Sequence, residues 1–182
     1  MHKIIAVCGM SGTGKSEVVK YLESKGFFRI YFGQATIDEI KRRGLDINEA
    51  NEKMIREELR KKHGMAAYAI INLDKISQAV SQNNVVIDGL YSWSEYKFLK
   101  EKFGDNLLVL TVTAPFKLRL ERLANRPVRP LSESEVKSRD LAEIENSEKG
   151  GPIAAADYTV VNNGTLGKLY QTLEIILQEI YQ

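Results

Sequence analysis

The stretch that decides the fold is Gly9-Met10-Ser11-Gly12-Thr13-Gly14-Lys15-Ser16, near the start of a chain of 182 residues. It follows the short apolar run from Lys3 to Cys8, which is β-branched and ends at a glycine, as buried parallel strands do. Apolar residues then recur at helical spacing from Gly14 to Lys25, and Gly26 is placed to end that helix. The glycine-rich stretch therefore lies between a strand and a helix.

The pattern of two glycines, a lysine and a serine is suited to holding phosphate groups. Glycine lets the backbone wrap around phosphate oxygens so that several N–H groups point at one place, and the start of the helix adds its positive dipole end. Lys15 is placed to bridge the β- and γ-phosphates, and the Ser16 hydroxyl to hold Mg²⁺. We therefore predict a site for ATP and Mg²⁺ at this stretch.

The rest of the chain alternates short strands with helices. Further strands are expected at 27–32, 85–89, 106–112 and 158–161, with helical segments between them and an amphipathic helix from Leu166 to Ile180. Such alternation predicts an α/β fold, a doubly wound parallel sheet of about five strands in a single domain over 1–182. The core is expected over 1–32, 83–125 and 155–182, with a charged helical insert over 33–82.

Composition narrows the class of protein. Lysine and arginine number 26 against 24 acidic residues, a net charge of +2, and 43% of residues are hydrophobic. This balance gives no global argument for a nucleic-acid or membrane surface, and the runs at 41–43 and 60–62 are balanced by nearby acids. The single cysteine, Cys8, excludes a disulfide framework and a multi-cysteine zinc site. The expectation is a cytoplasmic protein with no membrane segment, in which nucleic-acid binding is unlikely.

Two further features carry charge near the expected site. Asp88 ends the strand Val85-Val-Ile-Asp, where a carboxylate can hold a Mg²⁺-bound water; the alternative is an Asp-Gly turn. Arg119, Arg122 and Arg126 fall along one stripe of the helix after the fourth strand, and the break that starts at Pro127 is suited to hinging a flap over 126–154. Guanidinium groups pair bidentately with phosphate, although a solvated helix face would look the same.

The order of these features resembles the nucleoside monophosphate kinase superfamily of P-loop proteins. More narrowly, the chain is similar to adenylate-kinase-related prokaryotic proteins that are often labelled dephospho-CoA-kinase-like. The resemblance covers nearly the whole chain and rests on these motifs: Gly9 to Glu17, Leu59-Arg60 through His63-Gly64-Met-Ala-Ala67, Ile87-Asp88-Gly89, and Ala156-Asp157-Tyr158 leading into Asn162-Asn163-Gly164-Thr165-Leu166.

The resemblance implies a role for each matching position. Catalysis would rest on Lys15, Arg126 and Arg139, with the two arginines closing on the transferring phosphate from the lid over 126–154. Mg²⁺ would be held by Ser16 and, through water, by Asp88. The ATP-binding residues would be Gly9, Ser11, Gly12, Thr13, Gly14, Lys15, Ser16, Glu17, Arg122, Asn163, Gly164 and Thr165.

The acceptor side departs from the family pattern. An arginine that grips the acceptor phosphate is replaced by Ile37, and no arginine follows Asp88 in Gly89-Leu90-Tyr91-Ser92. Acceptor binding would then rest on Gly33, which starts the acceptor helix, on Asp88, and on Arg42, Arg43, Arg56 or Arg60. An acid that could deprotonate a hydroxyl acceptor is also displaced, with Gln34 in its place and Asp38 one turn later. The acceptor can therefore be a phosphate or a hydroxyl.

Two functions follow from this sequence. One is a kinase, as a monomer or homodimer, that transfers the γ-phosphoryl group of ATP to a small nucleotide-like acceptor, a nucleoside monophosphate or a dephospho-CoA-like molecule. The alternative is a nucleotide-switched regulatory ATPase without a small-molecule acceptor, which the missing arginines motivate. An added acceptor raises ADP production only in the kinase.

Overall fold

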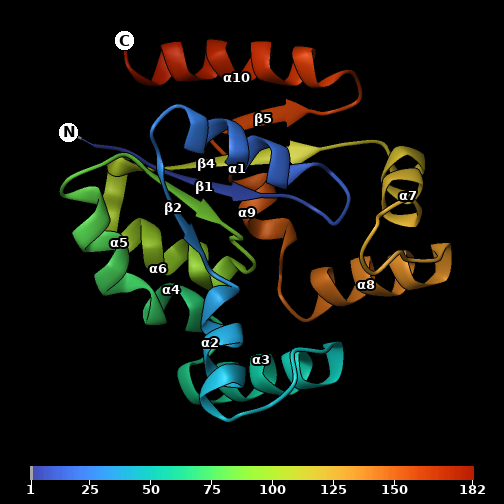
Figure 1. Ribbon diagram of the computed structural model, residues 1–182. Helices are drawn as coiled ribbons and strands as arrows, with labels where there is room; N and C mark the ends of the chain where they lie inside the picture. The colour runs from blue at the N-terminus through green and yellow to red at the C-terminus, as the bar shows by residue number, and fades with distance from the viewer. Residues whose placement is uncertain (1) are drawn as a thin grey trace.

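The structure is a computed structural model that describes residues 2–182, and it is built around one parallel sheet (Figure 1). Its strands are β1 Ile4–Cys8, β2 Phe28–Tyr31, β3 Val85–Asp88, β4 Leu107–Thr113 and β5 Tyr158–Val161. They lie in the order β2-β3-β1-β4-β5, and every pair is parallel. This confirms the predicted five-stranded, doubly wound sheet.

Helices cover both faces of the sheet and form two projecting groups. The helices are α1 Lys15–Ser24, α2 Gln34–Arg42, α3 Glu49–His63, α4 Ala67–Ile71, α5 Leu73–Val80, α6 Trp93–Phe103, α7 Phe116–Ala124, α8 Glu133–Glu145, α9 Gly150–Ala154 and α10 Leu166–Ile180, with a short 3₁₀ turn, η1 Gly104–Asn106. In Figure 1, α2 and α3 project below the sheet, and α7 and α8 lie to its right.

The central strand β1 shows how the two layers form. Its residues are all buried, so alternate side chains enter opposite cores. Ile4 and Ala6 pack with residues of α4, α5 and α6, whereas Ile5 and Val7 pack with residues of α1 and α10. Burial on both faces explains why the sequence reads as a continuous apolar run rather than an alternating one.

The segment over 126–154, for which the sequence predicts a lid, contains two helices. Most of it is helical, in α8 and α9. Ser132 accepts a hydrogen bond from the Glu135 backbone N–H while the Glu135 side chain accepts one from the Ser132 N–H. This reciprocal cap is a helix-start signal visible in the sequence Ser132-Glu-Ser-Glu135. Within residues 2–182 there is no helix whose length and apolar character would let it cross a membrane.

Candidate phosphate-binding site

The loop between β1 and α1 has a backbone that glycine makes possible. Gly9, Gly12 and Gly14 have φ values of 132°, 80° and 96°, a region that other residues rarely adopt. The loop also leaves no room for a side chain at two of these glycines. A Cβ on Gly9 would lie 2.2 Å from the Val112 carbonyl oxygen, and one on Gly14 would lie 2.2 Å from Nδ2 of Asn162.

Side chains from other elements hold the carbonyl groups of this loop. Asn162, buried just after β5, donates from Nδ2 to the Thr13 carbonyl at 2.8 Å. Arg122 of α7 donates to the Thr13 carbonyl at 3.4 Å and to the Asn162 carbonyl at 3.0 Å. Because C=O and N–H point in opposite directions across a trans peptide, these contacts turn the Gly14 N–H away from Asn162 and toward the open side of the loop.

Arg119 fixes the loop against the lid helix. It is 7% exposed and donates to the Ser11 carbonyl at 2.9 Å. The same guanidinium makes a bidentate pair with Asp140 of α8, at 3.0 and 2.6 Å. Arg119 therefore connects α7, the loop and α8, and its donors are already engaged by protein groups.

Lys15, the first residue of α1, lies in a crowded cationic environment. Its Nζ donates to the Met10 carbonyl at 2.9 Å. The pKa of Lys15 is lowered to about 7, mainly by burial and next by repulsion from Lys149, against the attraction of Glu143 and Asp88. Arg139 also lowers this pKa. A buried lysine with two further cations near it is a place where an added anion is favourable.

A carboxylate from α8 lies among these cations. Glu143 accepts hydrogen bonds from Ser11 Oγ at 3.3 Å, from Arg139 Nε at 3.2 Å and from Lys149 Nζ at 2.6 Å. The Ser11 hydroxyl belongs to the loop itself. A carboxylate is thus bound by donors of the kind that phosphate would use, so the residues present fit an anionic ligand at the loop.

The sequence did not single out Asn162, Asp140, Glu143 or Lys149. Asn162 belongs to the quoted motif 162–166, but only Asn163, Gly164 and Thr165 of that motif were predicted to contact the nucleotide. The spacing of Arg139 and Glu143, four positions apart on one helix, was a local signal for that ion pair. No local pattern links Glu143 to the phosphate loop, because Ser11 lies 132 positions away.

Asp88 ends β3 close enough to Lys15 to affect its pKa. Its carboxylate is paired with Arg29 of β2, whose Nε and Nη2 both donate to Oδ2, at 3.1 and 2.6 Å. That arrangement leaves Oδ1 to accept a hydrogen bond from a metal-bound water. The exposed Ser16 hydroxyl lies at the start of α1, as the predicted Mg²⁺ site requires. Both assignments stay predictions, as does the ATP contact of the half-buried Glu17, which pairs with Lys20 at 2.9 Å.

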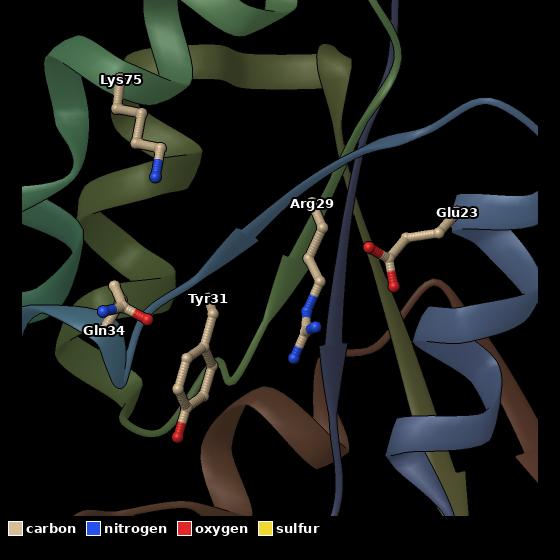
Figure 2. A pocket seen from close by; sticks show the side chains of 5 residues that line it. All are labelled: Glu23, Arg29, Tyr31, Gln34 and Lys75. Atoms are coloured by element: carbon tan, nitrogen blue, oxygen red, sulfur yellow. The ribbon is translucent and has the colours of Figure 1, made fainter. Parts of the chain in front are cut away.

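The predicted acceptor side lies at the other end of the site, where β2 leads into α2. Gly33 precedes α2, and a Cβ there would lie 2.3 Å from the ring of Tyr31. Figure 2 shows Tyr31 and Arg29 side by side on β2, in a pocket of about 430 Å³ that is also lined by Glu23, Gln34 and Lys75. Arg29 lies over the Tyr31 ring at 5.5 Å. Neither side chain was singled out for the acceptor by sequence.

The two predicted acceptor arginines have different surroundings. Arg42 is exposed and paired with Glu39 at 2.6 Å. Arg60 lies over the ring of Tyr68, at 6.0 Å, and its buried Nε has no hydrogen-bond partner within residues 2–182. The positive charge of Arg60 also acts on Glu95, which is fully buried and whose pKa burial raises to about 7. Both arginines stay predictions, and Arg60, unlike Arg42, forms no ion pair within residues 2–182.

The predicted lid arginines lie at the junction of α7 and α8. Arg126 donates to the Arg129 carbonyl at 2.7 Å, and burial, with Arg139 and Arg129 nearby, lowers its pKa. Arg129 pairs with Glu52 of α3 at 2.8 Å, so the lid touches the helical insert. Arg126 and Arg139 are therefore neighbours, as the catalytic prediction for these two residues requires.

The loop after β5 carries the remaining predicted ATP contacts. Thr165 caps α10 by accepting from the Lys168 N–H at 3.4 Å, and Asn163 and Gly164 are exposed just before it. Asn162 joins this loop to the phosphate loop. The nucleotide contact of 163–165 stays a prediction.

Comparisons with known sequences and structures assign this chain to a family and to a fold. A family profile described as an AAA domain matches residues 5–148. A UPF0200 protein of Thermococcus kodakarensis is 32% identical over 97% of each chain. The chain belongs to the UPF0200 family. A UPF0200 protein of Methanosarcina barkeri is 31% identical over 90% of this chain and 88% of its own.

Solved structures show the fold of this UPF0200 chain more broadly. A Thermus thermophilus protein matches with a TM-score of 0.67 at 20% identity over 98% of both chains. The shikimate kinase of Aquifex aeolicus matches with a TM-score of 0.59 at 22% identity over 98% of both chains. A gluconokinase of Sinorhizobium meliloti matches with a TM-score of 0.57 at 16% identity, over 98% of this chain and 95% of its own. These likenesses confirm the predicted P-loop kinase-like fold.

Proposed function

We propose that this chain is a phosphotransferase that moves the γ-phosphoryl group of Mg·ATP to a small acceptor. The observation that carries the proposal is the anion site at the phosphate loop. There the Glu143 carboxylate is held by Ser11, Arg139 and Lys149, beside a lysine whose pKa is lowered by burial and by a second cation. Two of the solved structures with this fold, a gluconokinase and a shikimate kinase, also support a phosphotransferase.

The chain's own residues supply positioning and charge. Within residues 2–182, the N–H groups of Lys15 and Ser16 at the start of α1 have no backbone carbonyl partner, so they are free to bind phosphate oxygens. Arg122 and Asn162 hold the loop rigid from behind, and Lys15 lies at its mouth. Mg²⁺, when bound, neutralises charge on the phosphates, and Ser16 and Asp88 are the residues that would hold it.

In the transfer itself, an acceptor oxygen forms a bond to the γ-phosphorus while the bond from that phosphorus to the bridging oxygen of ADP breaks. The electron pair of the broken bond stays on ADP. Catalysis of this kind needs positioning and electrostatic stabilisation and no covalent enzyme intermediate. A hydroxyl acceptor must also lose a proton, and Asp88 and Asp38 are the carboxylates on the acceptor side.

The acceptor class stays open within this proposal. A nucleoside monophosphate or a dephospho-CoA-like molecule would match the sequence resemblance, and Arg60, Arg42, Gly33 and Asp88 are the residues proposed for it. The second candidate, a nucleotide-switched ATPase without an acceptor, is favoured by one observation. Arg42, Arg43 and Arg56 of the insert are all paired with glutamates, which leaves little free charge for an acceptor phosphate.

The test is ADP production from Mg·ATP with a panel of nucleoside monophosphates, nucleosides and dephospho-CoA. A kinase responds strongly to one acceptor. Lys15→Ala should lower that turnover by at least about 100-fold while the protein stays folded, because transition-state charge loses its stabilising partner. Lys20→Ala, on the same helix and exposed, is the matched control. A panel without any response, with slow Lys15-dependent hydrolysis, would favour the ATPase.

A further inference from the structure

Lys149 is buried in a way that a structural lysine seldom is. It precedes α9, is 2% exposed, and lies over the ring of Tyr91 at 5.5 Å. Lysine is almost never fully buried unless it is paired. Its partner is Glu143, with the Nζ to Oε2 distance at 2.6 Å.

Glu143 connects this lysine to the phosphate loop. Its other oxygen, Oε1, accepts from Ser11 Oγ and from Arg139 Nε. One carboxylate therefore brings together the loop, α8 and the segment before α9. Each of its three partners donates a hydrogen bond, and two of them are cations, so an anion with more oxygens could replace it.

The charges around this carboxylate are not balanced. Lys15, Arg139 and Lys149 share Glu143, while Asp88 is already paired with Arg29. An incoming anion of charge greater than one would relieve the repulsion between the two lysines.

We propose that Lys149 is a catalytic residue that contacts the phosphoryl group being transferred, opposite Lys15, and that Glu143 fills this position while no nucleotide is bound. The proposal rests on the proposed function, because it names a residue for that transfer. When a triphosphate binds, its terminal oxygens take the donors of Ser11, Arg139 and Lys149, and Glu143 moves aside. A diphosphate does not reach the Glu143 position, so it leaves the contact between Glu143 and Lys149 in place.

A purely structural role for Lys149 makes a different prediction. In that case the pair with Glu143 only ties α8 to the segment before α9, and its loss affects all nucleotides alike. Selectivity between a triphosphate and a diphosphate separates the two roles without requiring turnover.

The experiment measures the affinities of Mg·ADP and of the non-hydrolysable triphosphate Mg·AMPPNP by titration calorimetry. Lys149→Met should reduce the preference for AMPPNP over ADP by about tenfold, the effect typical of one lost charge-assisted contact. Lys149→Arg should keep much of that preference. Lys137→Met, an exposed lysine of α8 that pairs with Glu133, is the matched control and should leave both affinities unchanged.

Glu143→Gln tests the same proposal without removing Lys149, and keeps it testable should Lys149→Met fail to fold. Glutamine can still accept hydrogen bonds but no longer competes as an anion. AMPPNP affinity should rise several-fold while ADP affinity stays nearly constant. Equal changes for the two nucleotides in both the Lys149 and Glu143 variants would overturn the proposal.

These outcomes are separate from those of the kinase test. If no acceptor stimulates turnover but Lys149→Met still loses its triphosphate preference, the kinase proposal fails and the contact of Lys149 stands. If an acceptor is found and Lys149→Met retains both its turnover and its preference, the kinase stands and the role of Lys149 is wrong.

Discussion

The phosphate loop and the helical insert differ in how many carboxylates pair with their cations. In the insert, Arg42 pairs with Glu39, Arg43 with Glu39 and Glu58, and Arg56 with Glu49 and Glu52. At the loop, Lys15, Arg139 and Lys149 gather around a single carboxylate, Glu143.

This difference indicates where the molecule can bind an anion. Exposed pairs such as those of the insert contribute little energy and leave little net field. Cations that share too few acids in a half-buried place attract a further negative charge. We therefore expect phosphate recognition at the loop, and we expect the insert to recognise any acceptor mainly by other means, with Arg60 as the exception.

The first prediction concerns how much the contacts around the phosphate loop contribute to the free energy of unfolding. Arg119→Met should lower the free energy of unfolding by about 3 kcal/mol, because it leaves Asp140 without its buried partner. Urea denaturation measures this change. Arg56→Ala, which removes an exposed pair in the insert, should cost less than about 1 kcal/mol. Similar losses for the two variants would remove the contrast between the regions.

The next effect is the pH dependence of nucleotide affinity. Lys15 binds phosphate as a cation, and its pKa in the free protein is about 7. Above that pH Lys15 of the free protein loses its proton, whereas Lys15 in contact with bound phosphate keeps it. The dissociation constant of Mg·AMPPNP should therefore rise by up to about tenfold per pH unit from pH 7 to 9. In Lys15→Arg, which stays charged, calorimetry should find no such rise, and a rise there would point to another group.

A third prediction concerns Glu95, which lies at the start of α6 and faces the insert. Burial raises its pKa to about 7, so the folded protein holds this proton at a higher pH than the unfolded chain does. Stability from this group is full below about pH 4.5 and is lost as the pH rises toward 7, by on the order of 3 kcal/mol. Glu95→Gln should flatten that decline in urea denaturation curves taken from pH 4.5 to 8.

The smallest effect separates the two predicted acceptor arginines. Arg42→Ala removes an exposed pair and should change the KM for whichever acceptor raises ADP production by no more than about twofold. Arg60→Ala removes a guanidinium with an unpaired Nε and should raise that KM more, by about tenfold. Equal changes in KM would show that pairing with a glutamate does not stop an arginine of the insert from binding the acceptor.

Much of the fold was predictable because its signals are local. The five strands were found as short apolar runs, and β1 and β3 read as continuous because both of their faces are buried. The segment over 126–154 was predicted as a lid because of the break that starts at Pro127, and helix α8 within it was not predicted. The cap between Ser132 and Glu135 was the available signal for it.

The candidate site was only half predictable. Sequence reasoning assigned the loop, Lys15, Asp88 and the lid arginines to the site, because each belongs to a motif of neighbouring residues, and their roles stay predictions. It placed Arg119 at the border of the lid, whereas the structure has its guanidinium engaged by Asp140 and the Ser11 carbonyl. Lys149 and Glu143 went unnoticed because neither stands in a motif.

The sequence by itself determined a phosphate-binding loop between a strand and a helix, since glycine conformations and side-chain periodicity depend on residues that adjoin one another. Only the tertiary structure decided which groups surround that loop. Glu143 meets Ser11 across 132 positions of the chain, and Asn162 meets Thr13 across 149. Such contacts depend on how the sheet stacks its crossovers and helices, and no local pattern encodes that arrangement.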